Sequence, residues 1–147
     1  MTITPDPIHG GEVALKTGET LRQEFRPDPA TYWRGHGILA LLGGVFAGLV
    51  LVATGNPYPW TGPVAAALAI GLRAAYLRSE VMAVRWRLTD RRLLGPGLRD
   101  IALGDIAAAR RFLGDVQVIT RSGDKHLMKY MADASGVIAA IKSDSRA

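Results

Sequence analysis

The sequence contains no cysteine, so the candidates for chemistry that we consider are its three histidines, its carboxylates, its serines and its arginines. His9, His36 and His126 lie far apart, and none has metal-ligand spacing to another histidine or a carboxylate. The sequence has no nucleophile motif and no phosphate-binding glycine loop. Asp100 and Asp105 are near enough in sequence to approach each other, without a third group to act with them. We therefore predict no catalytic residues, no metal and no cofactor, and so a protein that is not an enzyme.

Clustered arginines are the better candidates for a functional surface. Four follow one another around a predicted turn, and two more come later; together they are Arg85, Arg87, Arg91, Arg92, Arg110 and Arg111. A cation held near an anionic surface contributes about 1 kcal/mol to binding. We expect these arginines to bind a partner protein or lipid, mainly by general adhesion, since no basic loop typical of phosphoinositide recognition is present.

Apolar and charged residues are segregated along the 147 residues, of which 48% are hydrophobic. Residues 35–72 contain no Asp, Glu, Lys or Arg. Within them, residues 37–55 would span about 28 Å as a helix, close to the roughly 30 Å of a bilayer core. A second apolar run covers residues 60–77, and its Arg73 is near enough to the charged end to reach the headgroups. We predict a transmembrane helical hairpin over residues 35–78, with a buried hairpin of a soluble domain as the alternative.

Small residues recur at every fourth position of both predicted helices. They are Ala40, Gly44 and Gly48 in the first, and Ala67, Gly71 and Ala75 in the second. Such faces let helices approach closely, either within the hairpin or in a homodimer formed through Gly44 and Gly48.

The distribution of charge predicts the orientation of this hairpin. Residues 73–147 carry fourteen basic and eight acidic residues, whereas the loop of residues 56–61 carries none. Because Lys and Arg are retained on the cytoplasmic side, both termini should be cytoplasmic. Nucleic acid is not expected as a partner, since only Arg85-Trp86-Arg87 interleaves basic and aromatic residues.

Alternating residues indicate a small β-rich domain over residues 79–147. Val84, Trp86 and Leu88 alternate with polar residues, and short strand-like segments follow at residues 91–94, 98–106, 116–121 and 125–131. Phe112 and Leu113 indicate the beginning or the end of another strand. Asp133 is a predicted N-cap for a closing helix over residues 134–142, before a frayed tail. Residues 1–34 are expected to be a cytoplasmic N-terminal segment that can contribute one strand. The expectation is a curled antiparallel sheet closed by the C-terminal helix.

These segments resemble a known family, the bacterial PH-like domains found behind a pair of transmembrane helices in small membrane proteins. Residues 86–94 are similar to its aromatic-x-aliphatic-Thr-Asp-x-Arg strand-turn-strand. Residues 100–106 are similar to its I-P-L-x-x-I element, with Ala102 in place of proline. Residues 18–21 with Arg26-Pro27 resemble its leading segment, which often adds a strand. The resemblance covers residues 18–142 and implies a membrane α + β fold: a two-helix hairpin, then a small PH-like sheet closed by a helix.

The resemblance implies no activity. The leading hypothesis is a non-catalytic interaction module at the cytoplasmic face of the inner membrane, which assists assembly or stability of a membrane protein complex. Its expected partners are membrane lipids and a membrane protein or a second copy of itself. The alternative is a membrane-surface sensor that binds anionic lipid or a small ligand through its basic face.

Overall fold

The computed structural model describes residues 12–146 and divides the chain into two compact units. A helical unit spans Pro29–Val81, and a β unit combines the described residues up to Asp28 with those from Met82 onward. Residues 12–28 of the N-terminal segment belong to the same unit as the C-terminal strands and contribute the strand Leu21–Phe25, whereas residues 29–34 begin the first helix. The parts of that segment before residue 12, including His9, lie outside the described residues.

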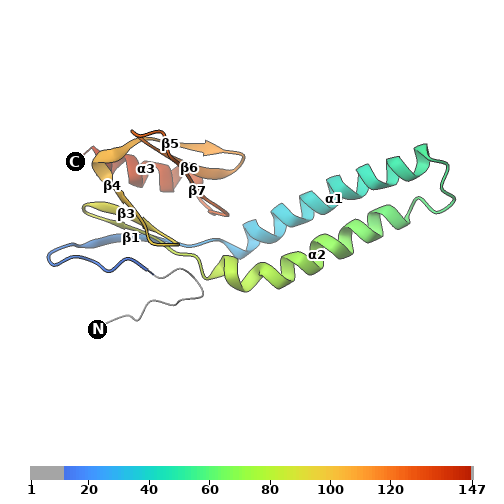
Figure 1. The fold of residues 1–147 in the computed structure, drawn as a ribbon, viewed down its shortest axis with the longest axis horizontal. Helices are drawn as coiled ribbons and strands as arrows, with labels where there is room; N and C mark the ends of the chain where they lie inside the picture. The colour runs from blue at the N-terminus through green and yellow to red at the C-terminus, as the bar shows by residue number, and fades with distance from the viewer. Residues whose placement is uncertain (1–11, 147) are drawn as a thin grey trace. The chain divides into compact units, whose positions relative to one another are not determined.

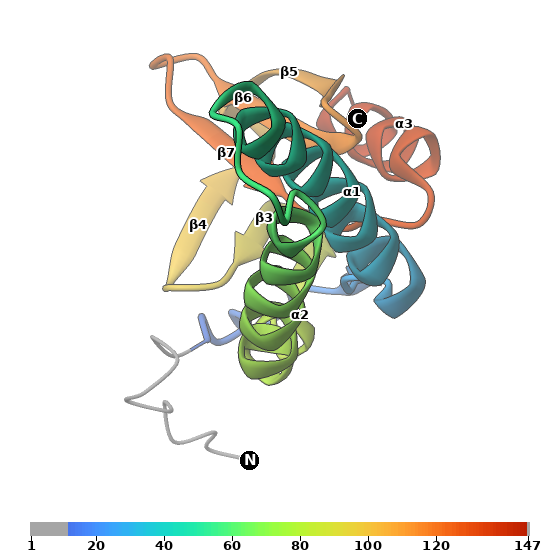
Figure 2. The same ribbon diagram turned by 90° about the vertical axis from the view of Figure 1, so that its right-hand side faces the viewer.

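The helical unit is a hairpin of two helices that lie side by side in both ribbon views (Figures 1 and 2). Helix α1 is Pro29–Ala53 and helix α2 is Thr61–Met82. Pro29 suits a first helical position, where its missing N–H is not needed. Gly55 follows the end of α1 with a φ of 75°, a conformation that glycine adopts without strain. Both helices are longer than predicted, since α1 begins six residues before position 35 and α2 continues beyond position 78.

Among the described helices, only α1 is long and apolar enough to cross a membrane by length and composition. Helix α2 also has the length, but it contains Arg73, Arg78 and Glu80. The sequence-based expectation of two spanning helices is therefore not confirmed by this criterion.

The two helices pack through small residues, on a face of α2 that differs from the predicted one. Gly44 is buried against Pro63, Gly48 lies beside the same proline, and Ala40 is partly buried. On α2, however, Ala67, Gly71 and Ala75 are exposed, and the buried positions are Gly62 and Ala74. A Cβ at Gly62 would lie 2.9 Å from the backbone of Ala47, so no larger residue fits there. At the other end of the hairpin, the Tyr32 hydroxyl donates to the Ala74 carbonyl at 2.6 Å.

The β unit contains two antiparallel sheets, where the pattern predicted one curled sheet. The first has the order β1-β2-β3-β4 and the second β5-β6-β7. Their strands are β1 (Leu21–Phe25), β2 (Trp86–Thr89), β3 (Arg92–Gly95), β4 (Arg99–Ala102), β5 (Ile106–Phe112), β6 (Asp115–Thr120) and β7 (Lys125–Met128). A single 3-10 turn, η1 (Leu103–Asp105), joins the sheets. The structure thus has a mixed α/β fold.

Helix α3 (Ala134–Ser145) packs against β5, β6 and η1 and completes the core (Figure 1). The Asp133 side chain caps it, as predicted, by accepting from the Gly136 N–H at 3.0 Å. The helix continues through the residues that were expected to form a frayed tail, up to Ser145. Val137 and Ile141 point into a core that both sheets share.

Trp86 is the largest fully buried side chain of the core, and its ring leaves no room for a side chain at Gly95 on the neighbouring strand. A Cβ at Gly95 would lie 2.6 Å from the Trp86 ring. Arg99 lies over the same ring, with its guanidinium carbon 6.0 Å from the centroid. The turn between β3 and β4 is therefore held against the start of β2.

Candidate interaction surface

Arg92 is at the centre of a buried ionic cluster. Its guanidinium donates to both carboxylate oxygens of Glu19, at 2.6 and 2.9 Å, and to Asp100 at 2.7 Å. The side chains of Arg92 and Glu19 are 7% and 0% exposed. Glu19 also accepts from the Thr89 hydroxyl at 2.8 Å and from the Lys16 backbone N–H at 2.9 Å. The carboxylate is thus fully hydrogen-bonded in its charged form.

These contacts fix the charges of the cluster. The hydrogen bonds from Arg92 lower the pKa of the Glu19 carboxyl to about 2, against the opposing effect of burial. The bonds from Glu19 in turn raise the pKa of Arg92. Because Glu19 stands before β1 and Arg92 on β3, the cluster binds the N-terminal segment to the first sheet.

Two further arginines hold the same segment farther along. Arg85 forms a bidentate pair with Glu12 and lies 3.8 Å from Glu24. Arg87 donates to the Val13 carbonyl. The hydrogen bonds from Arg85 lower the pKa of Glu12. Residues 12–19 therefore form a segment, which we call the N-terminal strap, that contacts Arg85, Arg87 and Arg92.

The predicted basic face is consequently not one open surface. Arg85, Arg87 and Arg92 are engaged by the N-terminal strap, and Arg92 is buried. Arg91 is exposed, with its Nε atom 3.9 Å from Asp90. These four arginines therefore do not form one open face, because three of them contact a segment more than sixty residues upstream.

The remaining two predicted arginines lie on β5, in the other sheet. Neighbouring residues of a strand point to opposite faces. Accordingly, Arg110 donates to the Gln117 side chain on β6 at 2.9 Å, whereas Arg111 donates to Ser135 on α3 at 3.1 Å. Both remain exposed to solvent.

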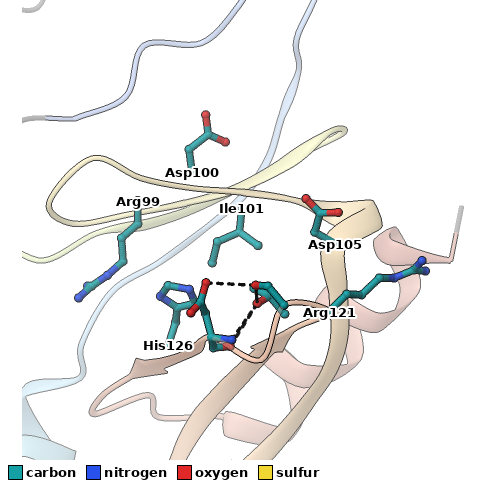
Figure 3. A pocket seen from close by; sticks show the side chains of 9 residues that line it. Arg99, Asp100, Ile101, Asp105, Arg121 and His126 are labelled. Atoms are coloured by element: carbon teal, nitrogen blue, oxygen red, sulfur yellow. Dashed lines mark hydrogen bonds between the residues drawn. The ribbon is translucent and has the colours of Figure 1, made fainter.

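A polar cavity of about 380 Å³ lies between β4 with η1 and the hairpin of β6 and β7. Figure 3 shows Arg99 and His126 on its left and Asp105 and Arg121 on its right. The lining residues are Arg99, Asp100, Ile101, Asp105, Thr120, Arg121, Ser122, Asp124 and His126. Asp100 and Asp105, which the sequence placed near enough to approach each other, both line this cavity.

Side chains of both charge signs line this cavity. Asp100 is bound to Arg92, and Asp124 accepts from Ser122 at 3.1 Å. No group of three or more potential metal ligands occurs within residues 12–146. Arginines beside carboxylates and hydroxyls suit a polar ligand that offers donors and acceptors together, as a peptide segment does.

Sequence reasoning missed this cavity. Arg99, Arg121 and His126 were not among the predicted site residues, and they come from three different elements. The only available signal was the local pair of Asp100 and Asp105; the other residues join them through the packing of one sheet against the other.

Comparison with known proteins gives no family: no family model matches, and neither curated proteins nor solved structures give a significant match.

Proposed function

We propose that this protein is a membrane-anchored, non-catalytic interaction module, whose β unit binds a membrane protein partner at the cytoplasmic face of the inner membrane. The role suggested is assistance in the assembly or stability of a membrane complex. The anchor is the hairpin of α1 and α2, and the partner site is the polar cavity.

The pairing of β1 with β2 carries the proposal of a two-helix anchor. Strand β1 precedes α1 and strand β2 follows α2, yet Phe25 pairs with Trp86 in one antiparallel ladder. A chain that crosses a membrane through α1 must therefore return before β2. Helix α2 is the only described helix between α1 and β2, so it is the segment that would return across the membrane. Its Arg73 lies nine residues before the end of the helix, and the long arginine side chain can extend from there towards the headgroups.

The outer surface of the hairpin supports a lipid environment. Large apolar side chains of α1 are exposed along its length; among them are Ile38, Leu41, Leu42, Val45, Phe46, Leu49 and Val52. Contiguous exposed apolar surface of this kind is costly in water. The excess of basic residues after position 73 favours a cytoplasmic β unit.

The PH-like assignment is part of this proposal. It is supported by antiparallel strands closed by the C-terminal helix α3, although these strands form two sheets and not the one curled sheet expected. The charges of both signs that line the cavity suit a polar partner segment.

The alternative of an anionic-lipid sensor is weaker on the described surface. Three of the six arginines named for it are already bound to the N-terminal strap. Binding of anionic lipid there would have to displace carboxylates and carbonyls that already satisfy these guanidinium groups.

The experiment is purification of the tagged full-length protein from native membranes in mild detergent, with mass spectrometry of the co-eluting proteins. The double variant Arg99→Ala with Arg121→Ala removes two cavity cations, and Lys129→Ala with Lys142→Ala removes two cations elsewhere. We expect one membrane protein in constant ratio with the wild type and the lysine variant, and its loss from the arginine variant. Elution of the chain alone in all three cases would refute the partner, and release from membranes by alkaline carbonate would refute the anchor.

A further inference from the structure

Two turns of the β unit present leucines in an unfavourable backbone conformation and leave them in solvent. Leu98, between β3 and β4, has a φ of 61°, and Leu113, between β5 and β6, has a φ of 49°. Their exposed fractions are 57% and 90%. Leucine resists positive φ because its Cβ crowds the backbone, and Asn or Gly would relieve the strain. Within the β unit these side chains gain little burial in return.

The two turns lie at the same end of the β unit. The turn with Leu98 connects Gly95 of β3 to its pairing partner Arg99 of β4, and Gly95 packs on the ring of Trp86. Trp86 is the first residue of β2, and it pairs with Phe25, the last residue of β1. The turn containing Leu98 is therefore beside the end of β1.

A chain of hydrogen bonds brings the second turn to the same place. The Tyr130 N–H donates to the side chain of Asp115, at the start of β6, and the Tyr130 carbonyl accepts from the Asp28 N–H at 2.7 Å. Leu113 is two residues before Asp115. Since Asp28 directly precedes α1, this is the end of the β unit from which the chain enters α1.

Chain length keeps this end close to the apolar part of α1. Six residues, about 9 Å of helix, separate Pro29 from residue 35, where the uncharged stretch begins. A loop tip that borders residues 25–28 is therefore within a short reach of any bilayer that α1 enters.

Cations flank both leucines in the sequence. Arg99 follows Leu98, while Arg110, Arg111 and the 43% exposed Phe112 precede Leu113. An apolar tip next to arginines matches the boundary between lipid chains and anionic headgroups.

From these observations we propose that the turns carrying Leu98 and Leu113 insert into the lipid interface and dock the β unit on the membrane surface. This inference rests on the proposed anchorage through α1. It assigns the strained leucines to lipid contact, whereas Arg85, Arg87 and Arg92 hold the N-terminal strap.

The absence of native cysteine allows a direct test with the full-length chain. Single variants Leu98→Cys and Leu113→Cys are labelled with an environment-sensitive dye and reconstituted in vesicles of phosphatidylcholine and phosphatidylglycerol. Ser122→Cys, in the turn at the opposite end of β6, is the matched aqueous control. Val45→Cys, in the middle of α1, reports the anchor. Nitroxides are placed either near the lipid headgroup or in the middle of the acyl chain.

We expect the shallow nitroxide to quench the dyes at 98 and 113 severalfold more than the dye at 122, with a blue-shifted emission at both leucine positions. If the dye at 45 is quenched by the deep nitroxide but those at 98 and 113 behave like that at 122, the anchor stands and this inference is overturned. If the dye at 45 is not quenched either, the proposed membrane anchorage itself fails.

Discussion

Replacement of Glu19 by glutamine should lower the free energy of unfolding of the β unit and make that free energy less dependent on pH. The carboxylate is fully buried beside Arg92, and its pKa falls from an ordinary 4.5 to about 2. A displacement of this size corresponds to about 3 kcal/mol of stability. Because the folded pKa is depressed, this contribution is complete above about pH 5 and is lost as the pH falls towards 2. About 2 kcal/mol of it should be gone at pH 3.

The assay is urea unfolding of the full-length protein in a non-ionic detergent, followed through the fluorescence of Trp86. Trp33→Phe and Trp60→Phe remove the other tryptophans, both of which belong to or border the helical unit. Glu19→Gln should unfold more easily than the parent by about 3 kcal/mol at pH 7 and show a much flatter response between pH 7 and pH 3.

Glu12→Gln is the graded control for this experiment. The Glu12 side chain is 35% exposed beside Arg85, so solvent and salt should weaken its contribution. Its loss should therefore cost less than the loss of Glu19, and added salt should reduce the difference. Wild-type stability and an unchanged pH response in Glu19→Gln would show that the buried cluster does not hold the N-terminal strap as argued.

Three further substitutions test the packing. Leu113→Asn should stabilise the β unit by up to about 1 kcal/mol in the same urea assay, because asparagine accepts the positive φ; a lower urea midpoint would contradict the strain. Gly95→Ala should cost about 2 kcal/mol, since its Cβ would press on the Trp86 ring, and an unchanged midpoint would refute that contact. Gly62→Leu should lower the thermal stability of the helical hairpin in detergent, followed by circular dichroism, whereas Gly71→Leu on the exposed face should leave it unchanged.

The strands and helices that follow from local patterns were predictable. Alternation of Trp86 and Leu88 placed β2, and Asp133 marked the start of α3, because both signals arise from neighbouring residues. Of strand β5 only the end at Phe112 was indicated, since its alanines and arginines favour a helix. Its pairing with β6 overrides that preference.

The phase of α2 shows a different limit of sequence reasoning. Alanines occupy positions 65, 66 and 67, so small residues every fourth position define more than one possible face. A shift of one residue rotates the face by 100°. The predicted face and the observed one, which includes Gly62 and Ala74, differ by such a shift.

The candidate site was the least predictable part. Arg91 and Arg92 look equivalent in the sequence, yet one is exposed and the other buried with Glu19, from which it is separated by 73 positions. Only the register of β1, β2 and β3 brings these groups together. The cavity likewise depends on two sheets whose separation the local pattern did not reveal.

The position of β1 ahead of the helical hairpin has a consequence for biosynthesis. Strand β1 leaves the ribosome before α1 and α2, but its partner β2 emerges only after both. Until then, β1 has no ladder to join, and the Glu19 carboxylate has no arginine at position 92 to bind. We therefore expect the first sheet to close only after the hairpin has been synthesised. A chain stopped after α1 would expose an unpaired strand, whose free N–H and C=O groups can pair with another chain and promote aggregation.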